Sequence, residues 1–593
     1  MESAPFFSDL NLLADACITF YSKRSGRAEP EGLRRRRAAL AKCAEGFHYE
    51  CGTSSPILKD KLRMLQEEDC IVLMTAHQPN LFPYSGVLRK TTLIFALSKK
   101  LEERLGVPIV SLYGIADQDF TDDRWVRSLQ LPACTRKDGV VEIKVDLPGR
   151  KMLHRVPKPP QAIMEKAKSE TKRWLDEISS SVGNLLREMS IPFRPGSELA
   201  SNMNAFMSMA EECYSRAESY SDFNSYLTSK VVNELWGYDT VFTRFSDCQH
   251  IFAGETAFFI ENFEAYSGYL REAIARSESK GLGGGVSCLE PESAPFWRNC
   301  ECGGKARLSL TREPDLLVFS GNCISCGHQY RLDIEKSKPM LPENVLPFIF
   351  PRSIPMILTF FKGFLPSCYV GGVGGMTYLQ EVQHIAKSMD IPLPPIAIWR
   401  PRDRYLGVGQ LEALLQLERM QSFLGSTDYA SAKILMEQRI AEIRRRTEEL
   451  QESKRAVYRQ LEKNPGDATL KQQLMKLNSD QAAHNRSSDY HGLSRDMVIL
   501  GNIPNTLYLA PSIIDYAVNI GIKETSEKWL QHLKNSGNLL SEVPMESVLT
   551  CQKGDEHGLP KYLIDRLDEL SSMILKLNER SLNYEYDEPD RRE

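Results

Sequence analysis

The strongest constraint on the fold is a strand–loop–helix–strand pattern between residues 70 and 113. A short apolar run rich in β-branched residues, Cys70 to Met74, precedes a polar loop and a predicted helix from about Ser85 to Leu105. Gly106 favours the end of that helix and Pro108 prevents its continuation, so the apolar run Val107 to Tyr113 is predicted to be a second strand. Two strands joined by a helix through short connections form a right-handed βαβ unit, which begins a parallel sheet.

The same kind of pattern returns in the second half of the chain. A strand-like run at Ser367 to Val370 leads into a glycine-rich loop, Gly371 to Gly375, and a helix that ends near Met389. A proline-rich strand is predicted at Pro392 to Trp399, and another lies at Thr240 to Phe245 within an otherwise helical stretch. The chain is therefore predicted to be an α/β protein.

Four closely paired cysteines interrupt the α/β pattern. Cys300 and Cys302 form a CxC pair, and Cys323 and Cys326 form a CxxC pair after an interval of twenty residues. The glycines that follow each pair let backbone amides turn toward the thiolates, and two such knuckles suit a tetrahedral Zn²⁺ in a zinc ribbon. Four cysteine ligands leave no position for water or substrate, so the predicted zinc is structural. A ribbon that binds nucleic acid or protein is the competing interpretation.

The C-terminal third carries a heptad-like pattern. Apolar or small residues recur at alternating spacings of three and four, with Lys454 as the exception, at Met436, Ile440, Ile443, Thr447, Leu450, Val457 and Leu461. The stretch Asn464 to Asp467 turns the chain, and the period resumes at Leu470, Leu474 and Leu477. This pattern predicts an antiparallel coiled-coil hairpin. The hairpin is expected either to pack on the core or to act as a dimerisation arm.

Charge and hydropathy exclude several classes of protein. The formal net charge of −4 over 593 residues gives no basic excess, so binding to duplex nucleic acid is not expected. The N-terminus has no basic segment followed by a long apolar run, and no stretch of about 18 uncharged apolar residues exists, so we expect neither a signal peptide nor a membrane span. Fourteen cysteines then indicate reduced thiols or metal ligands and a cytoplasmic location.

The loop that follows the first predicted strand is the leading candidate for a ligand site. It reads Thr75-Ala76-His77-Gln78-Pro79-Asn80 and immediately precedes a helix. Ligands of open α/β sheets bind outside the carboxyl ends of the strands, and helix N-termini attract anions. His77 can donate a hydrogen bond to a phosphate or carboxylate, and Gln78 and Asn80 supply neutral donors. The alternative is that His77 only satisfies a local hydrogen bond.

Two further segments carry candidate site residues. Asp117 and Asp119 follow the second predicted strand, where they can act as a base or hold a cation, or cap the next helix. The loop from Gly371 to Gly375 joins a strand to a helix, as a phosphate-cradling loop does, although it also suits tight packing of strand against helix. Arg352 lies in a Phe-Pro-Arg sequence and suits recognition of a planar anion, although a single arginine is unspecific.

Several of these segments, taken in order, resemble the bacillithiol biosynthesis cysteine-adding enzyme family (BshC). The resemblance covers about residues 65 to 405. The matching segments are the loop Thr75 to Phe82, similar to T-G-H-Q-P-G-L-F, the helix end Leu101 to Pro108, the acidic stretch Ala116 to Phe120, similar to E-D-H-D, the segment Pro342 to Leu346, similar to S-P-N-V-L, and the loop Val370 to Gly375, similar to V-G-G-P-G-E and followed by Tyr378 and Gln380.

The resemblance implies a fold, a reaction and partners. It implies a Rossmann-like core with inserted segments, similar to class I nucleotidyltransferases, and a C-terminal coiled coil that mediates homodimers. The implied reaction adds cysteine to glucosaminyl malate in the biosynthesis of a low-molecular-weight thiol. Formation of such an amide requires activation because the leaving group is poor, and we expect ATP to supply it. In this interpretation His77 stabilises a transferring oxygen, and Asp117 or Asp119 orients an amine or a metal. The implied substrate- or nucleotide-binding residues are Thr75, Gln78, Asn80, Gly371, Gly372, Gly374, Gly375, Tyr378 and Arg352.

The sequence also departs from the family pattern. Ala76 and Asn80 replace the loop glycines, Gln118 replaces the histidine between the acidic residues, and Gly375 replaces the glutamate of the glycine loop. The cysteine pairs appear as an insertion. Two alternatives therefore stand beside the ligase: a paralogue without catalysis that binds a macromolecule through its ribbon and coiled coil, and a nucleotidyltransferase-like enzyme with another acceptor.

The predicted organisation is an α/β fold with a Rossmann-like parallel-sheet core, a small zinc ribbon and a C-terminal coiled-coil hairpin. The expected segments are an N-terminal helical segment at 1–65, the first part of the core with a helical insertion at 66–280, the ribbon at 281–340, the second part of the core at 341–410 and a helical coiled-coil domain at 411–593.

Overall fold

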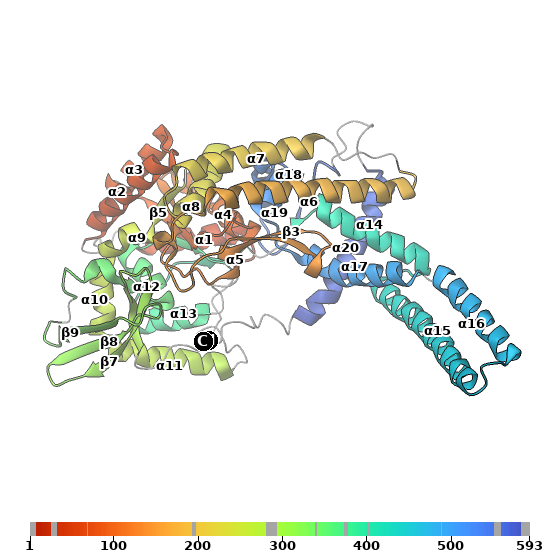
Figure 1. Ribbon diagram of the computed structural model, residues 1–593. Helices are drawn as coiled ribbons and strands as arrows, with labels where there is room; N and C mark the ends of the chain where they lie inside the picture. The colour runs from red at the N-terminus through yellow and green to blue at the C-terminus, as the bar shows by residue number, and fades with distance from the viewer. Residues whose placement is uncertain are drawn as a thin grey trace.

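The computed structural model describes most of the chain (Figure 1). The described residues are 7–24, 32–67, 69–191, 197–279, 293–338, 341–372, 378–399, 403–487, 489–550 and 559–582. Within them a five-stranded sheet has the order β12-β11-β1-β2-β5, and every neighbouring pair of strands is parallel. The strands are β1 (Ile71–His77), β2 (Ile109–Ile115), β5 (Val241–Arg244), β11 (Cys368–Val370) and β12 (Ile396–Ala397). The predicted α/β class with a parallel sheet is thus confirmed.

The predicted strand–helix–strand unit forms the centre of this sheet. Helix α4 (Ser85–Leu105) connects β1 to β2, and Gly106 ends it with a positive φ of 65°. Leu73 pairs with Ser111 on one side and with Cys368 on the other. The chain thus adds β2 and β5 on one side of β1 and later adds β11 and β12 on the other. The direction of addition reverses between β1 and β11. In open α/β sheets the ligand-binding crevice lies outside the carboxyl ends of the strands at such a reversal.

Helices surround the sheet. Three N-terminal helices precede β1, namely α1 (Leu10–Arg24), α2 (Leu33–Cys51) and α3 (Pro56–Glu67). A short helix α5 (Arg124–Arg127) and an antiparallel pair, β3 (Ser128–Pro132) and β4 (Val140–Lys144), follow β2. The helical stretch before β5 contains α6 (Gln161–Glu188), α7 (Ser197–Arg216), α8 (Tyr220–Lys230) and a π-helical turn at Val231–Leu235. Trp174 of α6 is fully buried and donates to the carbonyl of Pro132, which ties this layer to β3.

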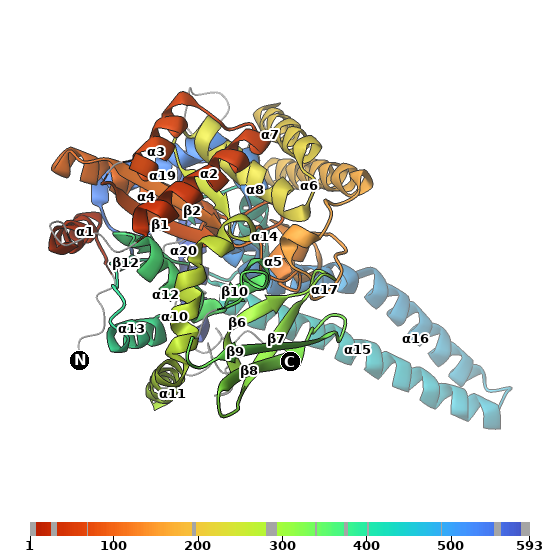
Figure 2. The same cartoon turned by 90° about the vertical axis from the view of Figure 1, so that its left-hand side faces the viewer.

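A second, antiparallel sheet carries the paired cysteines. Its order is β10-β6-β7-β8-β9, and it lies beside helices α10 (Ala253–Glu261) and α11 (Phe263–Ser279) in both ribbon views (Figure 2). The strands are β6 (Ser293–Asn299), β7 (Lys305–Arg312), β8 (Leu316–Asn322), β9 (Gln329–Glu335) and β10 (Ile349–Pro351). Helix α9 (Phe245–Cys248) follows β5, α12 (Ser353–Phe364) connects β10 to β11, and α13 (Leu379–Ser388) connects β11 to β12.

The C-terminal region is helical and includes a projecting hairpin. The hairpin consists of α15 (Tyr429–Lys463) and α16 (Ala468–Ser487), which extend away from the body in both views. Lys454, which interrupts the apolar period, donates to Gln481 at 2.7 Å across the hairpin. The other elements are α14 (Val408–Leu424), α17 (Tyr490–Tyr508), α18 (Ile513–Asn519), α19 (Ile522–Ser536), α20 (Lys561–Leu582) and the strand pair β13 (Asp403–Arg404) with β14 (Val543–Pro544). No helix in the described ranges is long and apolar enough to cross a membrane.

Candidate functional site

A buried lysine that the sequence analysis did not single out lies at the carboxyl ends of β1 and β11. Lys90, on the second turn of α4, is 6% exposed, and its ammonium donates to the carbonyl of Ala76 at 3.1 Å. Gly372 follows β11, and a Cβ built on it would lie 3.1 Å from the Lys90 Nζ atom. Burial lowers the pKa of Lys90 to about 7. We call Lys90, His77 and Gly372 the switch-point cluster.

His77 ends β1 beside this ammonium. Its Nδ1 atom lies 2.9 Å from the carbonyl oxygen of Gln78. Because a carbonyl only accepts, Nδ1 carries the proton in the neutral ring, and Nε2 is left as an acceptor. Burial and the charge of Lys90 lower the pKa of His77 to about 3, so the ring is neutral near pH 7. In this arrangement the Nε2 atom of His77 can accept a hydrogen bond, and the ammonium of Lys90 can donate one to an anion.

The other loop residues differ in their partners. The Thr75 hydroxyl is buried and donates to the carbonyl of Val370 at 2.7 Å, which fastens β1 to β11. Asn80 is 3% exposed, and neither atom of its side-chain amide has a hydrogen-bond partner within the described chain. Buried amides are normally satisfied, so Asn80 offers both a donor and an acceptor to a ligand or water.

Gly371 and Gly372 share a small pocket with Tyr378. The pocket is lined by Ile357, Tyr369, Gly371, Gly372, Tyr378, Leu379, Ile396 and Ile398. Its walls are apolar and aromatic apart from the glycine backbone, as they would be for a flat ring or an aliphatic group. Gly374 and Gly375 of the predicted loop lie outside the described residues.

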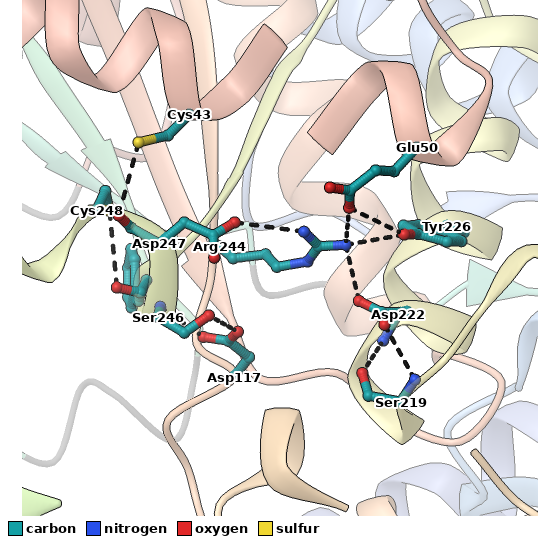
Figure 3. A network of polar contacts seen from close by, with 11 residues as sticks. Cys43, Glu50, Asp117, Ser219, Asp222, Tyr226, Arg244, Ser246, Asp247 and Cys248 are labelled. Atoms are coloured by element: carbon teal, nitrogen blue, oxygen red, sulfur yellow. Dashed lines mark hydrogen bonds and ion pairs between the residues drawn. The ribbon is translucent and has the colours of Figure 1, made fainter. Parts of the chain in front are cut away.

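Asp117 holds two strand ends together. Its side chain is fully buried and accepts from the backbone amide of Ser246 at 3.0 Å and also from the Ser246 hydroxyl (Figure 3). Burial raises the pKa of Asp117, while His154 and the hydrogen bonds from Ser246 oppose that rise. Asp117 therefore caps the short helix α9 after β5, although this helix lies far from Asp117 in the sequence.

Arg244 forms an ion-pair network next to Asp117. Its guanidinium contacts Glu50 and Asp222 at 2.8 Å each and Asp247 at 3.3 Å, and it donates to the Tyr226 hydroxyl (Figure 3). Burial would lower the pKa of Arg244, but these carboxylates raise it above its usual value. The three carboxylates around one guanidinium therefore hold α2, α8 and β5 together.

The charges of Asp119 and Arg352 both act on a second buried lysine. Lys305, the first residue of β7, is 4% exposed, and its ammonium lies 4.7 Å from the ring centre of Phe120, 5.7 Å from Trp297 and 6.0 Å from Phe350. Burial lowers the pKa of Lys305 to about 8, although Asp119 and Asp117 act to raise it.

Arg352 and Asn299 complete this group. The Arg352 guanidinium lies 4.8 Å over the Trp297 ring, and its charge also lowers the pKa of Lys305. Asn299 donates to Gln118 at 3.1 Å, while its own oxygen is buried without a partner among the described residues. We call Asp119, Lys305, Arg352 and Asn299 the acidic-loop cluster. Of the predicted site residues, His77 and Gly372 thus lie in the switch-point cluster and Asp119 and Arg352 in the acidic-loop cluster.

The four paired cysteines converge, and together they can hold a metal ion. All four sulfur atoms lie within 4.8 Å of one another. Cys300 and Cys326 are 3.7 Å apart, and Cys302 and Cys323 are 3.6 Å apart. Sulfurs bound about 2.3 Å from a zinc ion at the corners of a tetrahedron lie about 3.8 Å apart, so the donor set fits that metal.

Backbone amides support these sulfurs. Gly304 donates to Cys302 and Ser325 donates to Cys323, each at 3.4 Å. Burial acts to raise the pKa of Cys302, but the Gly304 amide and the neighbouring thiols lower it to about 6. Gly303 and Gly327 turn the two knuckles with φ values of +85° and +74°. Both knuckles therefore have the backbone geometry that stabilises thiolates.

The comparisons with known proteins agree with the resemblance seen in the sequence. The chain is 22% identical over 379 residues to a protein of Oceanobacillus iheyensis named "Putative cysteine ligase BshC". The match covers 61% of this chain and 61% of that protein, so the chain spans less than two thirds of the relative's length. No protein family model matches the chain. The chain is therefore a distant relative of a protein named as a cysteine ligase.

Sequence reasoning missed both buried lysines. Lys90 sits in a helix where a lysine ordinarily indicates a solvated face, but its neighbours Leu88, Thr91, Thr92 and Leu93 give no exposed stripe. That lack of amphipathic period is the signal that could have identified it. Lys305 follows the Cys-x-Cys-Gly-Gly knuckle directly, and its burial depends on aromatic side chains from three separate segments.

Proposed function

We propose that this chain is a ligase that forms a carbon–nitrogen bond between a small carboxylate and an amine. The amine is that of cysteine, and the carboxylate belongs to a sugar-linked acid such as glucosaminyl malate, as in the biosynthesis of a low-molecular-weight thiol. The observation that carries the proposal is the buried ammonium of Lys90, which lies with His77 and Gly372 at the crevice between β1 and β11. A cation held there suits an anionic substrate.

Two independent findings support this proposal. The strand order places two strands on each side of β1, as expected of a Rossmann-like nucleotide-binding core. The distant relative is named as a cysteine ligase, and its match extends over 379 residues. The first finding favours a nucleotide or another anion as ligand, and the second favours ligation as the reaction.

Ligation of a carboxylate requires activation, because its oxygen is a poor leaving group. We propose that the carboxylate oxygen attacks the terminal phosphorus of ATP, so that ADP leaves and an acyl phosphate forms. The amine nitrogen then attacks the carbonyl carbon, the amide bond forms, and phosphate leaves with the electron pair of the broken C–O bond. The proton lost from the amine goes to solvent.

The switch-point cluster has separate parts in this reaction. Lys90 neutralises charge on the phosphate oxygens, and the Nε2 lone pair of His77 accepts a hydrogen bond from the amine nucleophile. The apolar pocket beside Gly371 and Tyr378 receives a flat part of the nucleotide. Asn80 supplies a neutral donor and acceptor.

We also propose that Zn²⁺ occupies the four-cysteine group as a structural ion and that the α15–α16 hairpin pairs two chains as a coiled coil. The sulfur spacings support the zinc proposal. For the dimer, the support is the projection of the hairpin from the body together with exposed Tyr458 and Met475 on it. These two side chains are 49% and 66% exposed, which leaves apolar surface for a second hairpin.

Calorimetric titration of ATP into the zinc-loaded protein tests the function. We expect ATP to bind, and Lys90→Met to weaken binding about tenfold or more, as loss of one buried charge–phosphate contact does. Lys99→Met, on the exposed side of the same helix, is the matched control and should bind ATP as the wild type does.

Product formation is then measured by mass spectrometry with ATP, cysteine and glucosaminyl malate. The expected product has the summed mass of the two substrates less one water, together with one ADP per amide formed. If ATP does not bind even at millimolar concentration, the ligase proposal is wrong. Release of pyrophosphate with a nucleotidyl product would instead favour the nucleotidyltransferase alternative.

A further inference from the structure

We propose that the metal-bound cysteine knuckle positions Lys305 in the acidic-loop cluster, where Lys305 anchors an anionic oxygen group of the ligand. The inference rests on the proposed zinc site and extends the proposed function to a residue supplied by the antiparallel sheet. It assigns the metal a role in shaping the candidate site as well as in stabilising the ribbon.

The first step of the argument is the place of Lys305 in the knuckle. The loop Cys300 to Gly304 closes on itself through hydrogen bonds from Cys300 to Gly304 and from Gly303 to Cys300, at 2.8 and 2.9 Å. Lys305 follows immediately, pairs with Asn299 across the two strands, and accepts at its carbonyl from Ile324 of the second knuckle at 3.0 Å. The backbone of Lys305 is therefore held by both knuckles, which the metal joins.

The second step concerns contacts between the knuckle and the acidic loop. The carbonyl of Gly303 accepts from the Met152 amide at 2.8 Å, and the carbonyl of Cys302 accepts from the Lys151 ammonium at 2.6 Å. The next amides along, of Leu153 and His154, donate to the carbonyls of Asp119 and Asp117 at 3.0 and 3.1 Å. The knuckle thus holds the acidic loop through the segment 151–154.

The third step is the state of the Lys305 ammonium. Among the described residues it lies over three aromatic rings and makes no hydrogen bond. Rings stabilise a cation but leave its N–H groups without acceptors, so a ligand oxygen can accept from it. Either a carboxylate or a phosphate supplies such an oxygen. Asn299, whose backbone pairs with Lys305, has a buried amide oxygen without a partner among the described residues, so this oxygen can accept from a ligand hydroxyl or a water.

The test is a thermodynamic cycle that combines metal removal with Lys305→Gln. Malate and inorganic phosphate are titrated separately into zinc-loaded and chelated protein, so that the two arms distinguish a carboxylate from a phosphate. We expect at least one anion to bind the zinc-loaded wild type, and its affinity to fall about tenfold both on chelation and in Lys305→Gln. Chelation of Lys305→Gln should cause no further loss, because both changes remove the same contact. Lys305→Arg should restore binding to within about threefold of the wild type.

Lys336→Gln, an exposed lysine at the end of β9, is the matched control and should behave as the wild type. If neither anion binds the zinc-loaded wild type, or if the losses from chelation and Lys305→Gln are additive, the anchor proposal is overturned. ATP binding at Lys90 is measured independently, so failure of this proposal is distinguishable from failure of the proposed function.

Hydrogen exchange provides a readout that does not depend on a ligand. Chelation should raise exchange of the amides at 117–121 and 151–154 as well as those of the ribbon, and should leave β1 at 71–77 unchanged. Exchange confined to the ribbon would show that the metal does not position the acidic loop. Because Lys305→Gln keeps all four cysteines, it should retain zinc and its circular dichroism spectrum, which separates loss of the anchor from misfolding.

Discussion

The ammonium of Lys90 lies so close to Gly372 that a Cβ on this glycine would be 3.1 Å from the Nζ atom. One residue comes from the helix after β1 and the other from the end of β11, so their contact joins the two sides of the crevice. Glycine at this position lets the ammonium approach the backbone of the loop. The affinity of the crevice for anions should therefore depend on the absence of a side chain at residue 372.

Gly372→Ala should weaken ATP binding about three- to tenfold with little loss of stability. The added methyl group pushes the Lys90 ammonium away from the loop, and a flexible side chain can move at a cost of about 1 kcal/mol or less. Calorimetric titration and urea unfolding measure the two effects. Gly466→Ala in the hairpin turn, where an added Cβ meets nothing within 4 Å, is the control. Unchanged ATP affinity in Gly372→Ala would contradict the proposed position of the phosphates.

Lys90→Met should stabilise the protein at pH 6 and lose this advantage at higher pH. The pKa of Lys90 is about 7 in the folded chain and 10.5 in the unfolded chain, so its buried charge costs free energy when both states are protonated, below pH 7. The cost declines as pH rises from 7 to 10.5. We expect a gain on the order of 1–3 kcal/mol at pH 6, which becomes smaller above pH 7 and reaches zero near pH 10.5. Urea unfolding at several pH values gives this difference, and equal effects at pH 6 and 9 would disprove it.

Acid should destabilise the fold through His48 and His77. Burial lowers the pKa of each to about 3, so the folded state resists the proton that the unfolded state binds near pH 6.5. Stability is complete above pH 6.5 and falls toward pH 3, by about 1.4 kcal/mol per pH unit for each histidine. His48→Gln keeps a donor for Thr53 and an acceptor for the Phe242 amide and should remove one such slope. A pH dependence that is unchanged in His48→Gln would contradict the contribution of this histidine.

Purified protein should contain close to one zinc ion per chain. Cys323→Ser removes one of four ligands and should abolish the bound metal, because three thiolates alone leave the closed tetrahedral site incomplete. Elemental analysis after dialysis measures the content. Cys43→Ser, a thiol outside the group, should retain the metal. A fully folded wild type with no zinc would refute the assignment.

The hairpin proposal predicts a dimer that surface charges disrupt. The double variant Tyr458→Glu with Met475→Glu should lower the mass measured by light scattering from that of two chains to that of one. Like charges then replace the apolar surface between the hairpins. Val498→Glu, at another exposed apolar position on α17, should leave the mass unchanged. A wild type that is monomeric at tens of micromolar would exclude this interface.

Local patterns in the sequence were enough to predict the centre of the parallel sheet. The apolar runs that became β1 and β2 and the helix end at Gly106 depend only on neighbouring residues. The proline-rich segment at 392–399 was predicted as a longer strand, but only Ile396–Ala397 pairs with β11. Proline lacks the amide that a strand needs, which accounts for the difference.

The candidate site was harder to predict because its environments come from distant segments. Asp117 finds its partner in Ser246, 129 residues away, and no periodicity links the two. Lys305 is buried by Phe120, Trp297 and Phe350, which come from the loop after β2 and from the strands β6 and β10. Lysine side chains are ordinarily exposed to solvent, so the burial of Lys305 follows only from its tertiary contacts.

Strand β10 connects the antiparallel sheet to the parallel sheet along the chain. Ile349–Pro351 pairs with β6, and the following Arg352 precedes α12, which leads into β11 of the parallel sheet. An inserted domain that packs only on itself could be gained or deleted in one genetic event without damage to the rest of the fold. Removal of residues 293–338 here would strip β10 of its partner and leave an open edge beside the candidate site. We therefore expect the cysteine-bearing sheet and the parallel sheet to have changed together during evolution, because a substitution in one alters the packing of the other.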